Sequence, residues 1–176
     1  MSDQERPLSA DDEPFVPTGE PRPLPAGEAF KADPNTWYHL KVHYKDDKGN
    51  PVVGLMYPLN NSFPPSFWDY QVLSGLIPAV VKPSKVKVHP PDSTGWSKWE
   101  LDDGNWLSIK ATGWIYRSSA YPIGWQIMKD AGGNSRLCNN YWAGEAGYDW
   151  KGGTAPDACY MGMKRSPFTC ELVPAE

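Results

Sequence analysis

The sequence lacks any long apolar run. The longest, residues 76–81, is interrupted by Pro78 and falls far short of the roughly 18 apolar residues that a membrane-spanning helix requires. The first residues, Met1 to Arg6, contain neither the basic segment nor the apolar segment of a secretory signal peptide. We therefore predict no transmembrane segment, and a protein that is either cytoplasmic or exported by an unconventional route.

Basic residues are also scarce. Lysine and arginine number 17 against 21 aspartates and glutamates, which gives a formal net charge of -4. The acids concentrate in residues 1–35, so the rest of the chain is close to neutral. A nucleic-acid-binding surface is usually strongly basic, whereas the basic group here, Lys82, Lys85 and Lys87, is small. Nucleic acid is therefore excluded as the expected partner.

Only three cysteines, Cys138, Cys159 and Cys170, are present. Their spacing matches no zinc-binding pattern, and without a signal peptide reduced thiols are expected; one disulfide among the three is the alternative. His39 and His43 share the polar side of a strand pattern, but no third ligand lies near them in the sequence. No metal ion and no cofactor is therefore predicted.

Familiar catalytic motifs are missing as well. The sequence has no Gly-x-Ser-x-Gly, no His-Glu-x-x-His, no phosphate-binding loop and no Gly-x-Gly-x-x-Gly. Carboxylate pairs suited to glycoside hydrolysis arise by chance in any chain with 21 acids, so Glu145 and Asp149 do not by themselves indicate an enzyme. No catalytic residue is predicted, and a binding protein is favoured over an enzyme.

Turn-forming residues, in contrast, are abundant: the chain has 19 prolines and 16 glycines. Between them lie short segments with alternating apolar residues, which indicate strands. In Trp37–Tyr44 the side chains of Tyr38, Leu40, Val42 and Tyr44 are predicted to share one buried face. Further strand-like segments are 51–57, 67–73, 76–81, 85–89, 96–101, 106–110, 113–117, 123–128, 136–138, 158–163 and 168–173.

This pattern predicts an all-β fold: a single antiparallel β-barrel or β-sandwich domain built from hairpins, over residues 36–176. Residues 1–35 are predicted to form an acidic, proline-rich tail that is extended or disordered, because they offer few apolar side chains to bury. The turns Lys45–Asn50, Asp102–Asn105 and Lys129–Asn134 resemble one another. Shared Asp, Asn and Gly turn chemistry explains this better than an internal duplication does.

Aromatic residues are the informative part of the sequence. Seven of the nine tryptophans fall between Gly95 and Gly153. Burial in the core is the usual role of tryptophan, and it explains most of the residues on regular strands, among them Trp96, Trp99, Trp106 and Trp114. The segment from Asn139 to Trp150 is rich in glycine and asparagine and is harder to explain as core. We therefore expect the functional site there.

Flat rings beside amide side chains suit a sugar, which has an apolar face and a rim of hydroxyl groups. The expected function is non-catalytic, lectin-like binding of a glycan. Arg117 could orient an anionic substituent of the ligand. The residues expected to bind it are Tyr116, Arg117, Tyr121, Asn139, Asn140, Tyr141, Trp142, Tyr148, Asp149 and Trp150.

Two alternatives stay open. Trp and Tyr also favour the boundary of a lipid bilayer, so the aromatic surface would equally serve a membrane-active or toxin-like protein that binds lipid head groups. The second alternative is a hydrolase or other enzyme that acts on a carbohydrate or a small apolar substrate.

Overall fold

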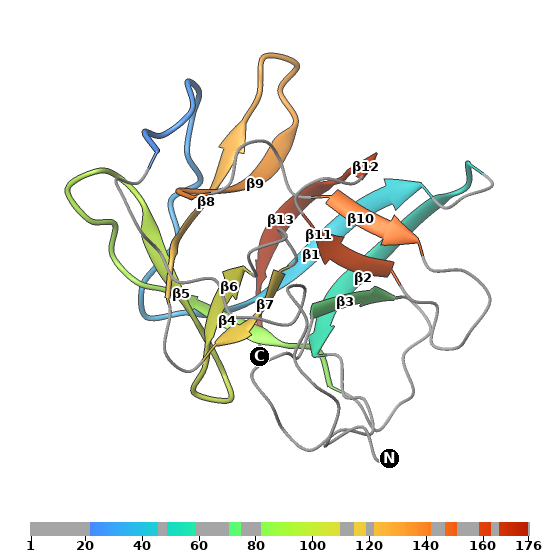
Figure 1. Ribbon diagram of the computed structural model, residues 1–176, viewed down its shortest axis with the longest axis horizontal. Helices are drawn as coiled ribbons and strands as arrows, with labels where there is room; N and C mark the ends of the chain where they lie inside the picture. The colour runs from blue at the N-terminus through green and yellow to red at the C-terminus, as the bar shows by residue number, and fades with distance from the viewer. Residues whose placement is uncertain are drawn as a thin grey trace, which may run out of the picture.

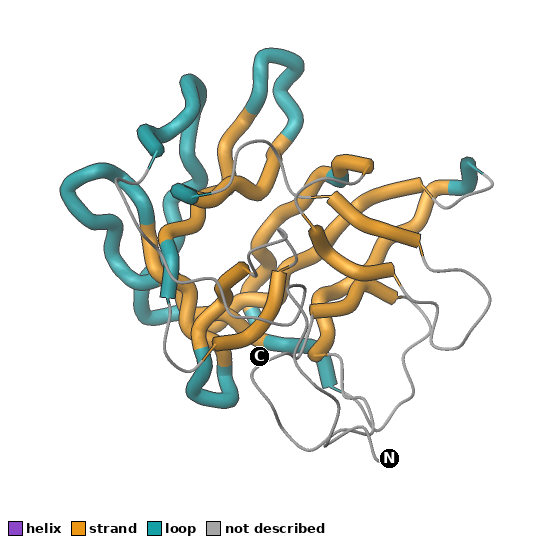
Figure 2. The backbone as a smooth tube through the Cα atoms, in the orientation of Figure 1, coloured by secondary structure: helices purple, strands orange, loops and turns teal. Residues whose placement is uncertain are grey.

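The computed structural model describes residues 22–45, 49–58, 71–74, 82–109, 115–118, 122–141, 147–150, 159–162 and 166–175. Within these ranges every regular element is a strand, joined by turns and loops, and no residue is helical (Figure 2). All strand pairs are antiparallel. The prediction of an all-β, antiparallel fold is confirmed for the described residues.

The strands are short and follow one another closely. They are β1 (Trp37–Lys45), β2 (Pro51–Pro58), β3 (Gln71–Ser74), β4 (Lys85–Val88), β5 (Ser97–Leu101), β6 (Trp106–Ile109), β7 (Ile115–Ser118), β8 (Gly124–Lys129), β9 (Ser135–Asn139), β10 (Gly147–Trp150), β11 (Cys159–Gly162), β12 (Ser166–Pro167) and β13 (Thr169–Pro174).

The sheet is open. Its main path runs β12-β10-β11-β3-β2-β1-β4-β5-β6-β7, and its two end strands, β12 and β7, do not pair with each other in the described part of the chain. A barrel requires that its first and last strands close the hydrogen-bond ladder. The barrel alternative is therefore not supported, while the sandwich alternative stays a prediction.

Strand β1 is the branch point of the sheet (Figure 1). Residues 38–43 pair with β13 along one edge. Along the other edge, β4 pairs with residues 37–39 and β2 with residues 41–45. The apolar alternation explains this central position, since the side chains predicted to point inward are all buried: Tyr38, Leu40, Val42 and Tyr44.

The core lies on one face of β1, β4, β5 and β6. Its largest fully buried side chains include Trp99, Trp125 and Phe168. The rings of Trp99 and Trp125 lie 6.3 Å apart between centroids, within the range of favourable aromatic pairs. The indole N–H of Trp125 donates a hydrogen bond to the carbonyl oxygen of Leu107 at 2.9 Å. This buried polar group therefore has the partner that burial demands.

Strands β8 and β9 form a hairpin that joins the rest of the sheet through β5. In its turn the carboxylate of Asp130 accepts hydrogen bonds from the backbone N–H groups of Gly132 and Asn134, both at 2.9 Å. The β5–β6 turn works similarly, because the carboxylate of Asp103 accepts from the backbone N–H of Asn105 at 2.9 Å. Both turns use the Asp chemistry that the sequence predicts.

Residues 22–36, here called the strap, lie beside β8, where Figure 1 shows them in blue. The backbone N–H of Phe30 donates to the carbonyl oxygen of Ile127, and that of Lys129 donates to Glu28, both at 2.9 Å. Ala29 forms a β-bridge with Met128. The described part of this segment thus adds backbone pairing to β8.

Candidate ligand-binding site

The structure describes only some of the residues that the sequence assigns to the site. The side chains of Arg117, Asn139, Asn140 and Tyr141 are described. Tyr116 lies in β7, and Tyr148, Asp149 and Trp150 lie in β10. Tyr121 and Trp142 lie outside the described residues.

Asn139, Asn140 and Tyr141 stand together at the end of β9. The backbone N–H of Asn140 donates to the carbonyl oxygen of Gly124, and its amide Oδ1 accepts from the N–H of Gly124, both at 3.1 Å. The amide oxygen of Asn139 accepts from the backbone N–H of Tyr141 at 2.8 Å. Both asparagines are buried. Through these hydrogen bonds their amide oxygens fix the backbone next to Tyr141.

Next to Tyr141 lies a cavity of about 360 Å³, here called the groove. It opens between the β4–β5 connection, the start of β8 and the end of β9. The side chains of His89, Asp92, Lys98, Pro122, Asn140 and Tyr141 contribute to its walls. Two neighbouring residues predicted for the site, Asn140 and Tyr141, therefore share a concave surface with residues from the β4–β5 connection and from β5.

Trp96 and Gly124 form the closely packed bottom of the groove. Trp96 is 2% exposed. A Cβ atom on Gly124 would lie 2.5 Å from the Cβ of Trp96 and 2.7 Å from Nδ2 of Asn140. Glycine is required at this position because no other residue leaves room for both neighbours.

The β4–β5 connection is held in shape by Asp92. One oxygen of its carboxylate accepts hydrogen bonds from the backbone N–H groups of Thr94, at 2.8 Å, and Trp96, at 3.3 Å. Partial burial raises the pKa of Asp92, but the hydrogen bonds from Thr94, Trp96 and Gly95 outweigh it and lower the pKa below its ordinary value of 3.8. Asp92 is thus ionised at neutral pH and keeps the rim of the groove in one conformation.

The polar groups at the groove balance each other in charge. Nε2 of His89 lies 2.9 Å from Oε1 of Glu100, and both side chains are about one-third exposed. Lys98 is exposed, and it lines the groove together with Asp92. The site can therefore offer hydrogen-bond donors and acceptors without a strong field of one sign.

Arg117 has a different place. It lies in β7, where its guanidinium donates a hydrogen bond to the carboxylate of Asp103 in the β5–β6 turn, and burial lowers its pKa below the ordinary value. It does not contribute to the walls of the groove. Among the described side chains the structure therefore brings Asn140 and Tyr141 together with the groove, and does not bring Arg117 there.

Sequence reasoning missed His89 and Lys98. Both occur in strand-like segments, where a polar residue normally faces solvent. They lie at the groove because β4 pairs with β5 and β5 pairs with β8. The backbone N–H of His89 bonds to the carbonyl oxygen of Lys98 at 2.9 Å. Lys98 in turn lies opposite Gly124. Such pairings are set by tertiary structure and are not visible in a single sequence.

A second cavity, of about 580 Å³, lies between the strap and the β4–β5 connection. Leu24, Phe30, Val88 and Pro91 make its lining largely apolar. Its buried polar side chains, Gln126 and Ser97, already have partners: the amide of Gln126 donates to the carbonyl oxygen of Gly95 at 2.8 Å and to the hydroxyl of Ser97 at 3.4 Å. A specific site needs a few well-placed polar groups, and the groove beside Tyr141 meets that requirement better.

Comparison of the chain with protein-family models, with curated proteins and with solved structures gave no match. In the described ranges, no helix has the length and apolar character to cross a membrane. The same residues contain no group of three or more His, Cys, Asp and Glu side chains arranged to hold a metal ion. The argument for function therefore depends on the groove itself.

Proposed function

We propose that the protein is a non-catalytic glycan-binding protein and that the groove holds the sugar. The observation that carries the proposal is the position of Tyr141. This half-buried aromatic residue packs against the core and also lines an open groove whose rim carries His89, Asp92 and Lys98. An aromatic wall with polar groups around it matches the two kinds of surface that a pyranose ring presents.

The chemistry of the groove favours a sugar for two reasons. The apolar face of a pyranose ring can lie against the ring of Tyr141, where contact displaces water from both surfaces. The hydroxyl groups of the sugar can both donate and accept hydrogen bonds, so they can pair with the ammonium group of Lys98 and with the carboxylate of Asp92. A groove with both charges suits an uncharged polar ligand.

The membrane-active alternative has less support from the described surface. Within the described ranges, the large apolar side chains that are exposed are Phe30 and Val53. They belong to separate elements, the strap and β2. Binding to a lipid interface depends on a contiguous apolar surface.

The test measures binding of a panel of uncharged oligosaccharides by tryptophan fluorescence and by calorimetry. Removing the ring in Tyr141→Ala should weaken binding about tenfold, since loss of one aromatic contact costs roughly 1.4 kcal/mol. Val53→Ala, an exposed change in β2, is the matched control and should bind like the wild type. Circular dichroism checks that both variants are folded.

Three results would count against the proposal. The first is a panel with no binding sugar. The second is a folded Tyr141→Ala variant that binds as tightly as the wild type. The third is the release of new reducing ends when the protein is incubated with a bound oligosaccharide, which would favour the enzyme alternative.

A further inference from the structure

A row of four side chains crosses the face of the sheet that points away from the core. The register places Trp37 of β1 opposite Lys87 of β4, Lys87 opposite Glu100 of β5, and Glu100 opposite Trp106 of β6. Residues directly opposite in an antiparallel pair point to the same face. These four residues, here called the Trp37–Trp106 row, therefore form a continuous line across four neighbouring strands.

The row is accessible. All four of its members are half-buried. Their neighbours along the strands, Tyr38, Val86, Trp99, Leu101 and Leu107, are buried on the other face. Side chains alternate between the two faces of a strand, so the core accounts for these neighbours and leaves the row on the outer face. Two tryptophans on that face are not explained by core packing.

His89 joins the row to the groove. Its ring lies 5.2 Å from that of Trp106, with an angle of 53° between the planes. Nε2 of His89 also lies 2.9 Å from Oε1 of Glu100, and His89 is part of the groove wall. Lys98, which lines the groove, is two residues before Glu100 and points to the same side of β5. The groove and the row are therefore parts of one surface.

The length of the row exceeds that of one sugar. Three steps between neighbouring strands, each about 4.8 Å, place the backbones of Trp37 and Trp106 about 14 Å apart. A single pyranose ring cannot contact both tryptophans, whereas a linear chain of several sugar units can. A tryptophan ring stands at each end of the row. Lys87 and Glu100, whose side chains can bond to hydroxyl groups, lie between the two rings.

The charges of the row cancel. Lys87 and Glu100 are opposite each other in the register, and Nζ of Lys87 lies 5.9 Å from the ring centroid of Trp37, within reach of a cation–π interaction. A surface that binds acidic polysaccharides usually carries unbalanced positive charge. The row lacks that excess, so its chemistry fits an uncharged chain.

We propose that the groove and the Trp37–Trp106 row together bind a linear, uncharged oligosaccharide, with one end in the groove and the other on Trp37. This inference rests on the proposed function, and it adds the class of glycan and its path over the protein. The sugar faces stack on Trp106 and Trp37, while Glu100 and Lys87 bond to hydroxyl groups between them.

The experiment compares chain lengths. Glucose oligomers with β-1,4 or β-1,3 links, and β-1,4-linked N-acetylglucosamine oligomers, are titrated from the disaccharide to the hexasaccharide. In the series that binds, affinity should increase at least tenfold from disaccharide to hexasaccharide. Trp37→Ala should lower the affinity for the hexasaccharide, and so reduce the gain with chain length, and leave disaccharide binding unchanged. Trp37→Tyr, which keeps a ring, should restore most of the length dependence.

The matched control is Lys41→Ala, a change on β1 that lies outside both the groove and the row. It should bind both lengths like the wild type. Raising the salt concentration should leave hexasaccharide binding unchanged, because the proposed chain is uncharged; a steep loss of affinity with salt would contradict this part of the proposal.

The outcomes separate the two proposals. Equal affinity for disaccharide and hexasaccharide, with both lost in Tyr141→Ala, would overturn the extended path and leave the groove as the glycan site. A Trp37→Ala variant with unchanged length dependence would also overturn it. Failure of every series to bind would overturn both proposals together.

Discussion

The indole N–H of Trp96 donates a hydrogen bond to the backbone carbonyl oxygen of Arg22, 74 positions earlier in the sequence, at 2.8 Å. Trp96 also lines the groove. Leu24 and Ala29 of the strap pack against the cluster that contains Trp96 and Met128. The strap therefore packs against a residue that lines the groove. A substitution at Trp96 should change the stability of the strap as well.

Trp96→Phe keeps an aromatic ring in this cluster but removes the hydrogen bond to Arg22. We expect the free energy of unfolding to fall by about 0.5–1.5 kcal/mol, because this partly buried hydrogen bond is lost. Hydrogen exchange should also become faster at the amide of Phe30, which bonds to Ile127. Chemical denaturation and amide exchange measured by mass spectrometry test the two effects.

Trp125→Phe provides the control for this change. It removes a similar buried hydrogen bond, from the indole of Trp125 to Leu107, but in the core. It should therefore lower stability by a similar amount without faster exchange in the strap under native conditions. Equal protection of Phe30 in Trp96→Phe and in the wild type would contradict the supporting role of the strap.

Gly124→Ala tests how tightly the bottom of the groove is packed. The added methyl group would lie 2.5 Å from the Cβ of Trp96, and relief of such an overlap typically costs about 1–3 kcal/mol. We expect a lower denaturation midpoint and weaker ligand binding. Gly132→Ala is the control, since the nearest atom to its new methyl group is Nδ2 of Asn134 at 3.2 Å; a larger effect there than at Gly124 would refute the prediction.

Several strand positions could be predicted from the sequence because strands such as β1 and β4 bury one face. The alternation in Trp37–Tyr44 predicts β1 and its buried side chains, and Val86 and Val88 are buried in β4 as expected. Turn residues predict the hairpin of β5 and β6, whose turn contains Gly104 with a φ of 88°. These features depend on neighbours in sequence, so one sequence is enough to reveal them.

The strap could not be predicted in the same way. It pairs with β8 through backbone groups of Glu28 and Phe30, and backbone N–H and C=O groups are the same in every residue except proline, which lacks the N–H. The prolines and acids of this segment suggest a solvated tail. Its apolar side chains are too widely spaced to form a strand pattern, although Leu24 and Ala29 are enough to cover Trp96 and Met128.

The candidate site was predictable only in part. The abundance of aromatic and amide side chains directs attention to Asn139–Tyr141, and the groove lies there. The hydrogen bonds between Asn140 and Gly124 could not be foreseen. The side-chain amide of an asparagine can bond either to another part of the chain or to a ligand, and the sequence does not tell the two apart. Assigning His89 and Trp37 to one surface needs the strand order β1-β4-β5-β6, which only the structure supplies.

The cysteine thiols provide a test of the core. The side chains of Cys138 and Cys170 are buried. Burial, and then the nearby thiol of Cys138, raise the pKa of Cys170 far above its ordinary value of 9.0. Cys170 should therefore resist iodoacetamide in the native protein at pH 8 and react fully in denaturant, as mass spectrometry can show. Rapid alkylation of native Cys170 would contradict its placement in the core.

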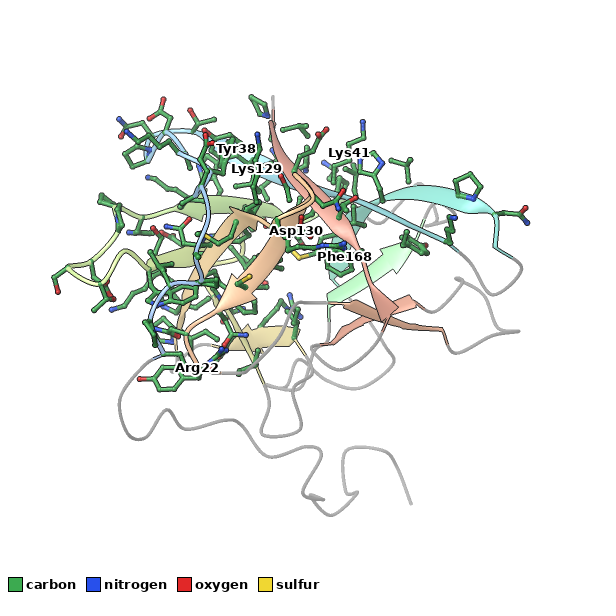
Figure 3. All side chains as sticks on the ribbon, turned by 90° about the horizontal axis from the view of Figure 1, so that it is seen from above. Arg22, Tyr38, Lys41, Lys129, Asp130 and Phe168 are labelled. Carbon is green, nitrogen blue, oxygen red and sulfur yellow. The ribbon has the colours of Figure 1, made fainter. Side chains whose placement is uncertain are left out.

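Asp130 should make stability depend on pH. The backbone N–H of Asn134, with Arg136 and Gly132, lowers the pKa of Asp130 below its ordinary value of 3.8. Arg136 connects this turn to the residue that precedes β13, because it bonds to Asp130 at 3.2 Å and to the carbonyl oxygen of Phe168 at 3.0 Å. Figure 3 labels both partners, Asp130 and Phe168. A pKa that is lower in the folded state means that ionised Asp130 stabilises the fold above pH 3.8, and that this contribution is lost as the pH falls through the folded-state pKa.

Asp130→Asn isolates that effect, because an amide oxygen still accepts from Gly132 and Asn134 while the charge opposite Arg136 is lost. We expect the variant to have a lower urea midpoint than the wild type at pH 7. The difference should shrink at acidic pH, below 3.8, where the wild-type carboxylate also becomes neutral. A difference that stays constant across this range would show that Asp130 acts through the shape of its turn and not through its charge.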